Sequence, residues 1–185
     1  MKEITLEWLE EKTICTKPLE AFEKKFEKRA STEDVVNYLH AEKRHCWEAW
    51  LLSQNLELTV DLLEKGANVH AGGDLPLCFA AGGGRLEIVK RLIKEGATNY
   101  DQALIWAAGG GHLKVVKFLI KKGADIHAND DQALDWAVRS RCLKVVKFLI
   151  RKGAKIYAYH DEILISAKIE NDEEMLELLE PIQQK

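Results

Sequence analysis

The sequence predicts an all-α solenoid in which pairs of short helices stack in a row. The stretch DQALIWAAGGGHLKVVKFLIKKGADI at 101–126 returns 30 residues later as DQALDWAVRSRCLKVVKFLIRKGAKI at 131–156. Within the repeated unit, Leu113, Val116, Leu119 and Ile120 form an apolar stripe at helical spacing. A Gly-Ala pair then ends the unit. Because one helix pair cannot bury such a stripe, the units must stack on one another.

The repeat can be followed along the chain by two kinds of position. The glycine that ends the second helix recurs at Gly66, Gly96, Gly123 and Gly153, and the first-helix leucine at Leu77, Leu104, Leu134 and Leu164. A degenerate first unit begins with a helix at 44–53 that carries Trp47 and Trp50, and a last, more polar unit spans 161–180. We therefore expect about four repeats and a C-terminal cap within residues 44–185.

The core of the unit, GHLKVVKFLIKKGADI at 111–126, resembles the ankyrin repeat, and the resemblance extends over about residues 44–180. It implies a helix-turn-helix solenoid with projecting fingers that binds other proteins. The period is about three residues shorter than in standard ankyrin repeats. The usual opening of the first helix survives only as Leu75-Pro76-Leu77-Cys78. We expect short fingers with a weakened hydrogen-bond network, as in repeats of large viruses and bacteria, which these resemble.

Residues 1–43 lack the repeat and predict three short helices, at 6–11, 19–28 and 33–42. The pattern from Cys15 to Leu52 resembles a small helical module of uncharacterised phage and bacterial proteins. The end of a solenoid needs a cap, so we expect this N-terminal helical module to cover the open end. Trp47 and Trp50 would lie at the joint.

The amino-acid composition limits the classes of protein to which the chain can belong. The 185 residues are 46% hydrophobic, which suffices for one continuous body with a stable core. We find no apolar run of transmembrane length and no signal-peptide pattern at the start, and we expect a cytoplasmic protein without a membrane partner. The cysteines are far apart and predict free thiols, at Cys15, Cys46, Cys78 and Cys142.

Basic residues recur at matching positions of the second helices and predict a ridge on the outer, convex side. They are Lys90, Lys94, Lys114, Lys117, Lys121, Lys144, Lys147 and Arg151. The favoured interpretation is a solvated helix face, and the alternative is an electrostatic track for nucleic acid. No aromatic residues interleave the ridge for base stacking, which counts against binding of single strands.

The sequence gives little support for a phosphate-binding, metal-binding or catalytic site. The triplets Gly82-Gly83-Gly84 and Gly109-Gly110-Gly111 are not followed by Lys-Ser or Lys-Thr, so a phosphate-binding loop is disfavoured. Their first two glycines are expected to leave bare patches where a partner backbone can approach. Neither His40 nor His45 has ligands at a known metal spacing. We expect no catalytic residue, cofactor or metal.

Aromatic and polar residues supply the candidate contacts. Phe79, Trp106 and Trp136 share one repeat position, where core packing between repeats is favoured over a contact surface. Tyrosines at finger tips suit binding because they offer large area with few torsions to restrict, although Tyr157 has packing along the finger as an equal alternative. The predicted partner-binding residues are Tyr100, Asn129, Asp130, Arg139, Ser140, Arg141, Tyr157, Tyr159 and His160.

These observations predict a protein-interaction module that is not an enzyme and that occupies a partner through its concave face and fingers. The viral and bacterial resemblance suggests an inhibitor or an immunity-type protein. Nucleic-acid binding by the basic ridge is the alternative, and a structural role in self-assembly is a third.

Overall fold

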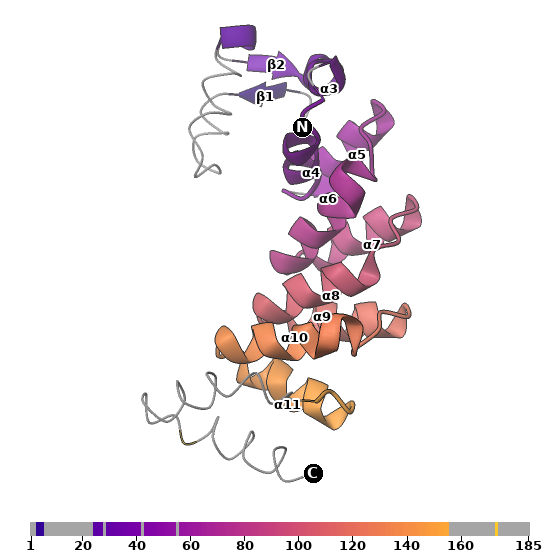
Figure 1. Ribbon diagram of the computed structural model, residues 1–185. Coiled ribbons are helices and arrows are strands. Elements are labelled where there is room, and N and C mark those ends of the chain that lie inside the picture. The colour runs from indigo at the N-terminus through magenta and orange to yellow at the C-terminus, as the bar shows by residue number, and fades with distance from the viewer. Residues whose placement is uncertain are drawn as a thin grey trace.

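The computed structural model describes residues 3–5, 24–27, 29–41, 43–54, 56–155 and 173. The elements are β1 (Glu3–Thr5), β2 (Arg29–Ser31), α3 (Thr32–Ala41), α4 (His45–Leu52), α5 (Leu56–Glu64), α6 (Ala71–Gly82), α7 (Leu86–Lys94), α8 (Tyr100–Gly109), α9 (Leu113–Lys121), α10 (Ala128–Arg139) and α11 (Leu143–Arg151). From α4 onward the helices form pairs that stack in one curved row (Figure 1), which confirms the predicted solenoid. None of these helices is long and apolar enough to cross a membrane.

The stack has two layers of helices. The first helices of the pairs, α4, α6, α8 and α10, pack side by side, and the second helices, α5, α7, α9 and α11, form the other layer. Small residues let the first helices approach closely, because Ala107, Ala108 and Ala137 are fully buried between them. The helix expected at 113–120 is found at Leu113–Lys121, and its Val116 and Leu119 are fully buried.

Each second helix ends at a glycine in the left-handed conformation. At Gly123 the φ angle is 102°, and the Ala124 amide donates to the Leu119 carbonyl at 3.1 Å, as in a Schellman cap. Gly66, Gly96 and Gly153 have φ angles of 91°, 108° and 98°. The Gly-Ala stop predicted from the sequence is therefore confirmed in four repeats.

The N-terminal segment differs from the prediction, because it contains a small antiparallel sheet. Strands β1 and β2 pair with Ile4 opposite Ala30, and both residues are buried. Three-residue strands are too short to show the alternating pattern that would identify them in a sequence. The helix expected at 33–42 is α3, whereas the helix expected at 6–11 lies outside the described residues, as does most of the one expected at 19–28.

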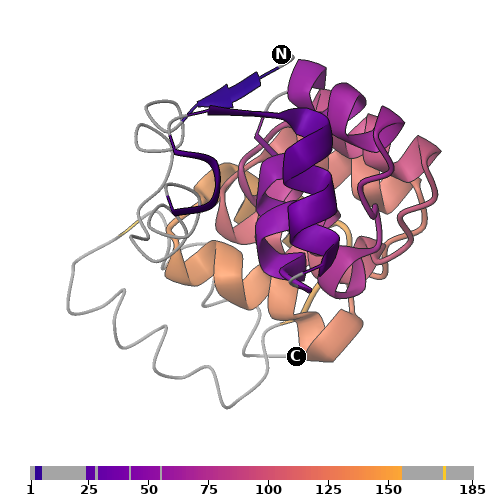
Figure 2. The same cartoon turned by 90° about the horizontal axis from the view of Figure 1, so that it is seen from above.

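Helix α3 and the two strands share a hydrophobic core with the first repeat. One cluster of buried residues joins Ile4, Ala30, Val35, Val36 and Leu39 to Leu51, Leu52, Leu58, Leu62 and Ala67 of α4, α5 and the following turn. Viewed from above, α3 lies over the stacked helices (Figure 2). The boundary expected at residue 43 therefore crosses a shared core, and a separate module at 1–43 stays a proposal.

The fingers between repeats are turns whose backbone is left-handed over three residues. The φ angles are 61°, 77° and 66° at Gly72, Gly73 and Asp74, and 52°, 56° and 58° at Asn129, Asp130 and Asp131. The finger that follows Gly96 is three residues shorter and goes directly into α8. Asp101, which matches Asp74 and Asp131 in the repeat, is kept in this shortened link but does not have a left-handed backbone.

Side-chain carboxylates hold adjacent fingers together. Asp74 Oδ2 accepts from the backbone amides of Thr98 at 2.7 Å and Asn99 at 2.9 Å, and Asp101 Oδ1 accepts from the Asp125 amide at 2.7 Å. In the first repeat, Glu48 takes this role by accepting from the Asn68 amide. The short fingers were predicted, but their network is not simply weakened, since side-chain carboxylates connect them.

Candidate functional site

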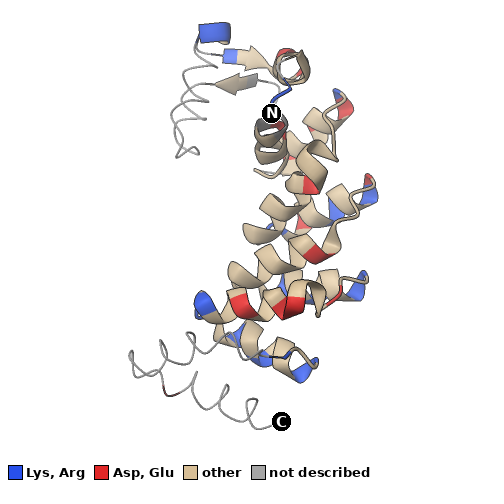
Figure 3. Ribbon diagram, in the orientation of Figure 1, with Lys and Arg blue, Asp and Glu red and all other residues tan. Residues whose placement is uncertain are grey.

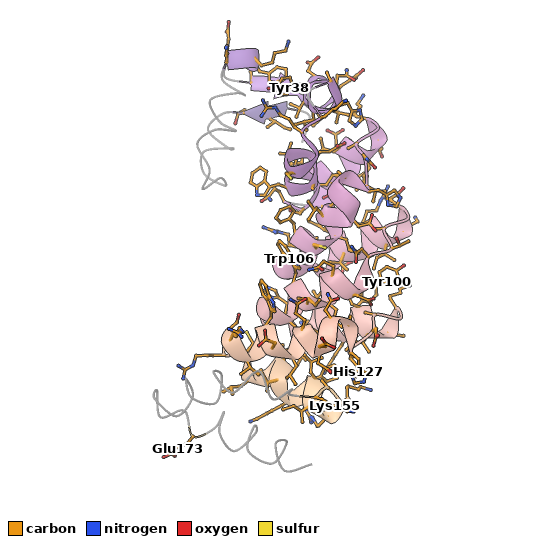
Figure 4. The ribbon with its side chains drawn as sticks, in the orientation of Figure 1. Tyr38, Tyr100, Trp106, His127, Lys155 and Glu173 are labelled. Carbon is orange, nitrogen blue, oxygen red and sulfur yellow. The ribbon has the colours of Figure 1, made fainter. Side chains whose placement is uncertain are left out.

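A pocket of about 390 Å³ opens where the first helices end. It spans four repeats, on the inner side of the curved stack, where Figure 4 shows Trp106. Its lining residues are Trp50, Ser53, Gln54, Phe79, Gly82, Gly83, Arg85, Trp106, Gly109, Gly110, Trp136 and Ser140.

The aromatic residues of this pocket form a surface, and the favoured packing between repeats holds only in part, since Trp106 packs against the core whereas Trp136 is exposed. Trp136 is 45% exposed, and Trp106, Phe79 and Trp50 are half-buried. The rings of Phe79 and Trp106 meet edge to face, with centroids 5.4 Å apart and planes at 82°. We use the name aromatic surface for Trp50, Phe79, Trp106 and Trp136.

Helical geometry explains this exposure and offers the signal that sequence reasoning missed. In α8 the buried stripe runs through Leu104, Ala107 and Ala108, at i, i+3 and i+4. Trp106 lies at i+2, which places its side chain on the other side of the helix. A large aromatic residue off the buried stripe predicts contact with solvent or with a partner.

The glycines beneath the rings are covered, so the predicted bare patches are not present at Gly82 and Gly109. A Cβ atom added to Gly82 would lie 3.3 Å from the Trp106 ring, and one added to Gly109 would lie 2.9 Å from the Trp136 ring. Each tryptophan thus lies on the glycine of the preceding repeat. Because these glycines have no side chain, the two rings can pack closely against their backbone.

Cationic side chains border the aromatic surface. Arg85 lines the pocket and folds back over Gly83. At the end of α10, the Nε of Arg139 donates to Asp135 at 2.9 Å, and Arg141 is exposed with a left-handed φ of 56°. Figure 3 shows Lys and Arg at this inner end of α10. Among the described residues, those that line the pocket include no Asp or Glu, so their side chains offer positive charge.

The predicted partner-binding residues do not form one surface. Arg139, Ser140 and Arg141 end α10 beside the pocket, while Tyr100, Asn129 and Asp130 lie at the opposite ends of α8 and α10. Figure 4 shows this separation, with Trp106 at the inner edge and Tyr100 and His127 at the other. Tyr157, Tyr159 and His160 lie outside the described residues.

Local structure explains which residue types occur at the edge of the stack that carries the fingers, which we call the finger edge. Asn129 and Asp130 have left-handed backbones, which Asn and Asp tolerate better than most residues. Tyr100 is half-buried and packs against the main hydrophobic core. These three positions can therefore be explained by conformation and packing alone.

The finger edge also holds paired histidines and carboxylates. His70 Nδ1 lies 2.6 Å from Asp74 Oδ1, and His127 Nδ1 lies 2.8 Å from Asp131 Oδ1, which agrees with the turn hydrogen bonds expected for these histidines. Burial alone would raise the pKa of Asp74. Hydrogen bonds from Thr98, His70 and Asn99 outweigh burial and hold this pKa below its ordinary value.

The basic residues of the second helices are exposed or half-exposed, and aromatic rings lie among them. The Lys117 Nζ is 5.4 Å from the centroid of the Phe148 ring, and the Lys122 Nζ is 5.8 Å from that of Phe118. Two rings thus lie along this ridge, where none was expected for base stacking. Both rings are half-buried against the core under the lysine chains, which limits them as stacking platforms.

Residue types that could bind a metal or form a disulfide do not come together in the described part of the chain. There, no group of three His, Cys, Asp or Glu residues could hold a metal ion. Cys46, Cys78 and Cys142 are free. Burial and the nearby Asp74 raise the pKa of the Cys78 thiol to about 12, so this thiol stays protonated and unreactive at neutral pH.

The chain matches the model of a known family. A family model described as ankyrin repeats, three copies, matches residues 31–130 and 97–160. No curated protein matches the chain.

Proposed function

Because the chain belongs to the ankyrin-repeat family, whose members generally bind proteins and are typically not enzymes, we propose that it occupies a partner protein through its aromatic surface. The observation that carries this proposal is the exposure of Trp136, at 45%, beside three half-buried aromatic rings. Large aromatic residues grouped in a pocket are the usual centre of a protein interface.

The surface meets two further requirements of a binding site. Four repeats contribute to one pocket, so the site extends along the solenoid, as binding surfaces of stacked repeats do. The rings also rest on the glycines of the preceding repeat, which fixes their orientation before a partner arrives. Preorganised contacts bind more tightly because less conformational entropy is lost on association.

We extend the proposal to an inhibitory or immunity-type role, in which the chain masks a site on its partner. Its support is that the described residues present a recognition surface without a metal cluster, so an effect is expected to come from occupancy. Loss of the partner's activity in a purified complex tests this role, and an unchanged activity would contradict it.

The experiment uses the full-length chain as bait in a lysate of its native host. The captured partner is purified, and its affinity is measured for wild type, Trp136→Ala and Arg141→Ala. We expect Trp136→Ala to weaken binding about thirtyfold or more, as a hot spot would. Tyr159→Ala tests the predicted finger-tip contact in the same assay. Unchanged affinity of both the Trp136 and Arg141 variants would refute the proposal.

Nucleic-acid binding remains the second candidate, because the lysines of α9 and α11 are aligned and mostly exposed. The quadruple variant Lys114→Glu, Lys117→Glu, Lys144→Glu and Lys147→Glu tests it. A nucleic-acid site with six to ten phosphate contacts would lose about 10³–10⁵ in affinity between 50 and 200 mM salt. If this variant loses nucleic-acid binding while Trp136→Ala keeps it, the result would favour the second candidate.

A further inference from the structure

We propose that Arg85 anchors a carboxylate of the partner, in a segment that also places an apolar side chain against Trp106. This inference rests on the proposed function and adds the residue that determines which side chain of the partner is accepted. Three observations support it. Arg85 lacks a counter-charge in the described part of the chain, its guanidinium lies next to an aromatic ring, and it is the one charged side chain among the described lining residues.

The guanidinium of Arg85 has no partner among the described residues. Arg139, at the end of α10, is paired with Asp135 at 2.9 Å. Arg85 forms no hydrogen bond, ion pair or ring contact with any described residue, although its side chain is half-buried. A guanidinium keeps its charge and offers five N–H donors. Partial burial withdraws these donors from water, so a partner that supplies an acceptor gains binding free energy.

The polar residues of the pocket do not supply this acceptor. Gln54 Nε2 donates to the Trp50 carbonyl at 2.9 Å and to Ser53 Oγ at 3.3 Å. Oxygen atoms that remain on the lining side chains are neutral and make no bond to Arg85. Asp135, at the border of the pocket, is already in an ion pair. The charge of Arg85 is therefore uncompensated among the described residues, which favours a negatively charged group of the partner.

The turn that ends α6 brings the guanidinium next to Trp106. A Cβ atom added to Gly82 would lie 3.3 Å from the Trp106 ring, and one added to Gly83 would overlap with Arg85 Nη1. Consecutive Cα atoms are about 3.8 Å apart, so the ring and the charged group lie over neighbouring residues. A ligand that reaches one of them also reaches the other.

Comparison of the repeats shows that this position of Arg85 is particular to it. The equivalent residue of the next repeat, His112, packs on Gly84 of the preceding turn, where an added Cβ would lie 2.6 Å from His112 Cε1. In the first repeat the place of Gly84 is held by Gln54. The preceding turn thus offers Arg85 no glycine to pack on. Arg85 lies instead over Gly83 of its own turn, at the pocket.

A single guanidinium beside a ring favours a carboxylate next to an apolar side chain. A carboxylate carries one charge and can accept two parallel hydrogen bonds from a guanidinium. A phosphate group carries about two charges and is typically bound by a cluster of arginines, whereas Arg85 is alone among the described lining residues. The apolar side chain would lie against Trp106 and Phe79, whose rings meet edge to face. It would exclude water from the ion pair, which strengthens the pair.

The test is selection of 12-residue peptides from an unbiased displayed library on the full-length chain. We expect the selected peptides to contain aspartate or glutamate next to an aromatic or aliphatic residue. Replacing that acidic residue by lysine should weaken binding to wild type at least tenfold. The lysine peptide should bind Arg85→Glu at least tenfold more tightly than the acidic peptide does, because the charges of both partners are then exchanged. A purely structural role of Arg85 would not produce this rescue.

Two further variants connect the peptides to the guanidinium. Arg85→Met keeps an unbranched side chain but removes the charge, and Gly83→Ala keeps the charge but displaces the guanidinium, because the new Cβ would overlap with it. Both should weaken the acidic peptides at least tenfold. Lys155→Glu is the matched control, because it is exposed at the opposite edge (Figure 4) and changes the charge as Arg85→Glu does. It should leave affinity unchanged. Circular dichroism of each variant verifies that the fold is retained.

Each outcome decides the inference. Peptides that need Trp136 but bind Arg85→Met as tightly as wild type would overturn the carboxylate anchor and leave the proposed protein-binding function standing. Failure of the exchanged charges to restore binding would have the same consequence. Peptides indifferent to both Trp136→Ala and Arg85→Met would overturn the inference and the proposed function. Selection of no peptide would overturn the inference alone, since a folded partner surface could still bind.

Discussion

At the turn after α10, Arg141 has the left-handed backbone that glycines have in the two preceding repeats. Its φ is 56°, against 70° at Gly84 and 73° at Gly111. A left-handed residue with a side chain costs about 1–2 kcal/mol. We predict that Arg141→Gly raises the free energy of unfolding by about 1 kcal/mol, measured by urea denaturation.

A matched control comes from the preceding repeat. Gly111→Ala should lower the free energy of unfolding, because its backbone is left-handed and the new Cβ would lie 2.8 Å from the Cys142 Sγ. A stability loss in Arg141→Gly would show that contacts of the Arg141 side chain outweigh the backbone strain. A strained arginine beside a pocket is itself consistent with a binding role.

Asp74 makes stability depend on pH. All of its partners donate: His70 Nδ1 to Oδ1, and the Thr98 and Asn99 amides to Oδ2. In Asp74→Asn an N–H group faces a donor whichever way the amide turns. We predict a loss of about 1–3 kcal/mol in the free energy of unfolding at pH 7. Asp101→Asn should cost less, since Asp101 accepts a single hydrogen bond from the Asp125 finger.

The sign of the pH effect follows from the lowered pKa of Asp74. The folded state holds the carboxylate charged more strongly than the unfolded state does, so this stabilisation is present above the ordinary pKa of about 3.9. It is lost as the pH falls through the lower, folded-state pKa. Urea denaturation at several pH values below 5 should show wild type and Asp74→Asn converging. A difference that stays constant with pH would contradict this account.

At the scale of elements, the sequence predicted the second helices best. The stripe of α9 and the stop at Gly123 fix both ends of that helix, because period and glycine conformation are local properties. The strands β1 and β2 were missed, since their pairing joins residues 26 positions apart, Ile4 with Ala30, and is not local. The exposure of Trp106 and Trp136 depends on the helix stripe, which was present in the sequence.

The finger network was beyond prediction for a different reason. Asp74 and Asp101 sit at the same position of the repeat and looked like ordinary helix-start residues. Their carboxylates accept from amides 24 residues later, in the next finger. Only the stacked structure brings these groups together. The separation of Tyr100 from Arg139 likewise follows from the length of the helices between them.

The N-terminal elements lead to a prediction about truncation. Removing residues 1–43 exposes Leu51, Leu52 and Leu58, which are buried against α3 and the strands. We predict that the 44–185 fragment aggregates, measured by size-exclusion chromatography with light scattering. A soluble fragment that melts cooperatively would show that the N-terminal residues form an independent domain.

The substitution Trp50→Ala tests the same junction as the truncation. The ring is half-buried, packs against the N-terminal core and lines the pocket. Trp50→Ala should therefore cost less than the roughly 3–5 kcal/mol expected for a fully buried tryptophan. It should also weaken binding of the partner. Full loss of folding in thermal denaturation would show that Trp50 serves the core alone.

At the scale of the whole molecule, the stack presents two surfaces of different character. The aromatic surface varies from repeat to repeat, from Phe79 to Trp106 to Trp136, and is bordered by arginines. The basic face of the second helices repeats the same lysines and keeps its rings covered. A specific interface needs variation in shape and chemistry, whereas a solvated face needs only charge. This contrast favours the aromatic surface as the place where a partner binds.

Covalent footprinting of the purified complex tests this claim most directly. Tryptophan oxidation and lysine acetylation are measured by mass spectrometry with and without the bound partner. We predict that Trp136 and Trp106 become protected from oxidation, while Lys114, Lys117 and Lys144 are acetylated as in the free chain. Protection of these lysines, with Trp136 oxidised as fast as in the free chain, would contradict the account.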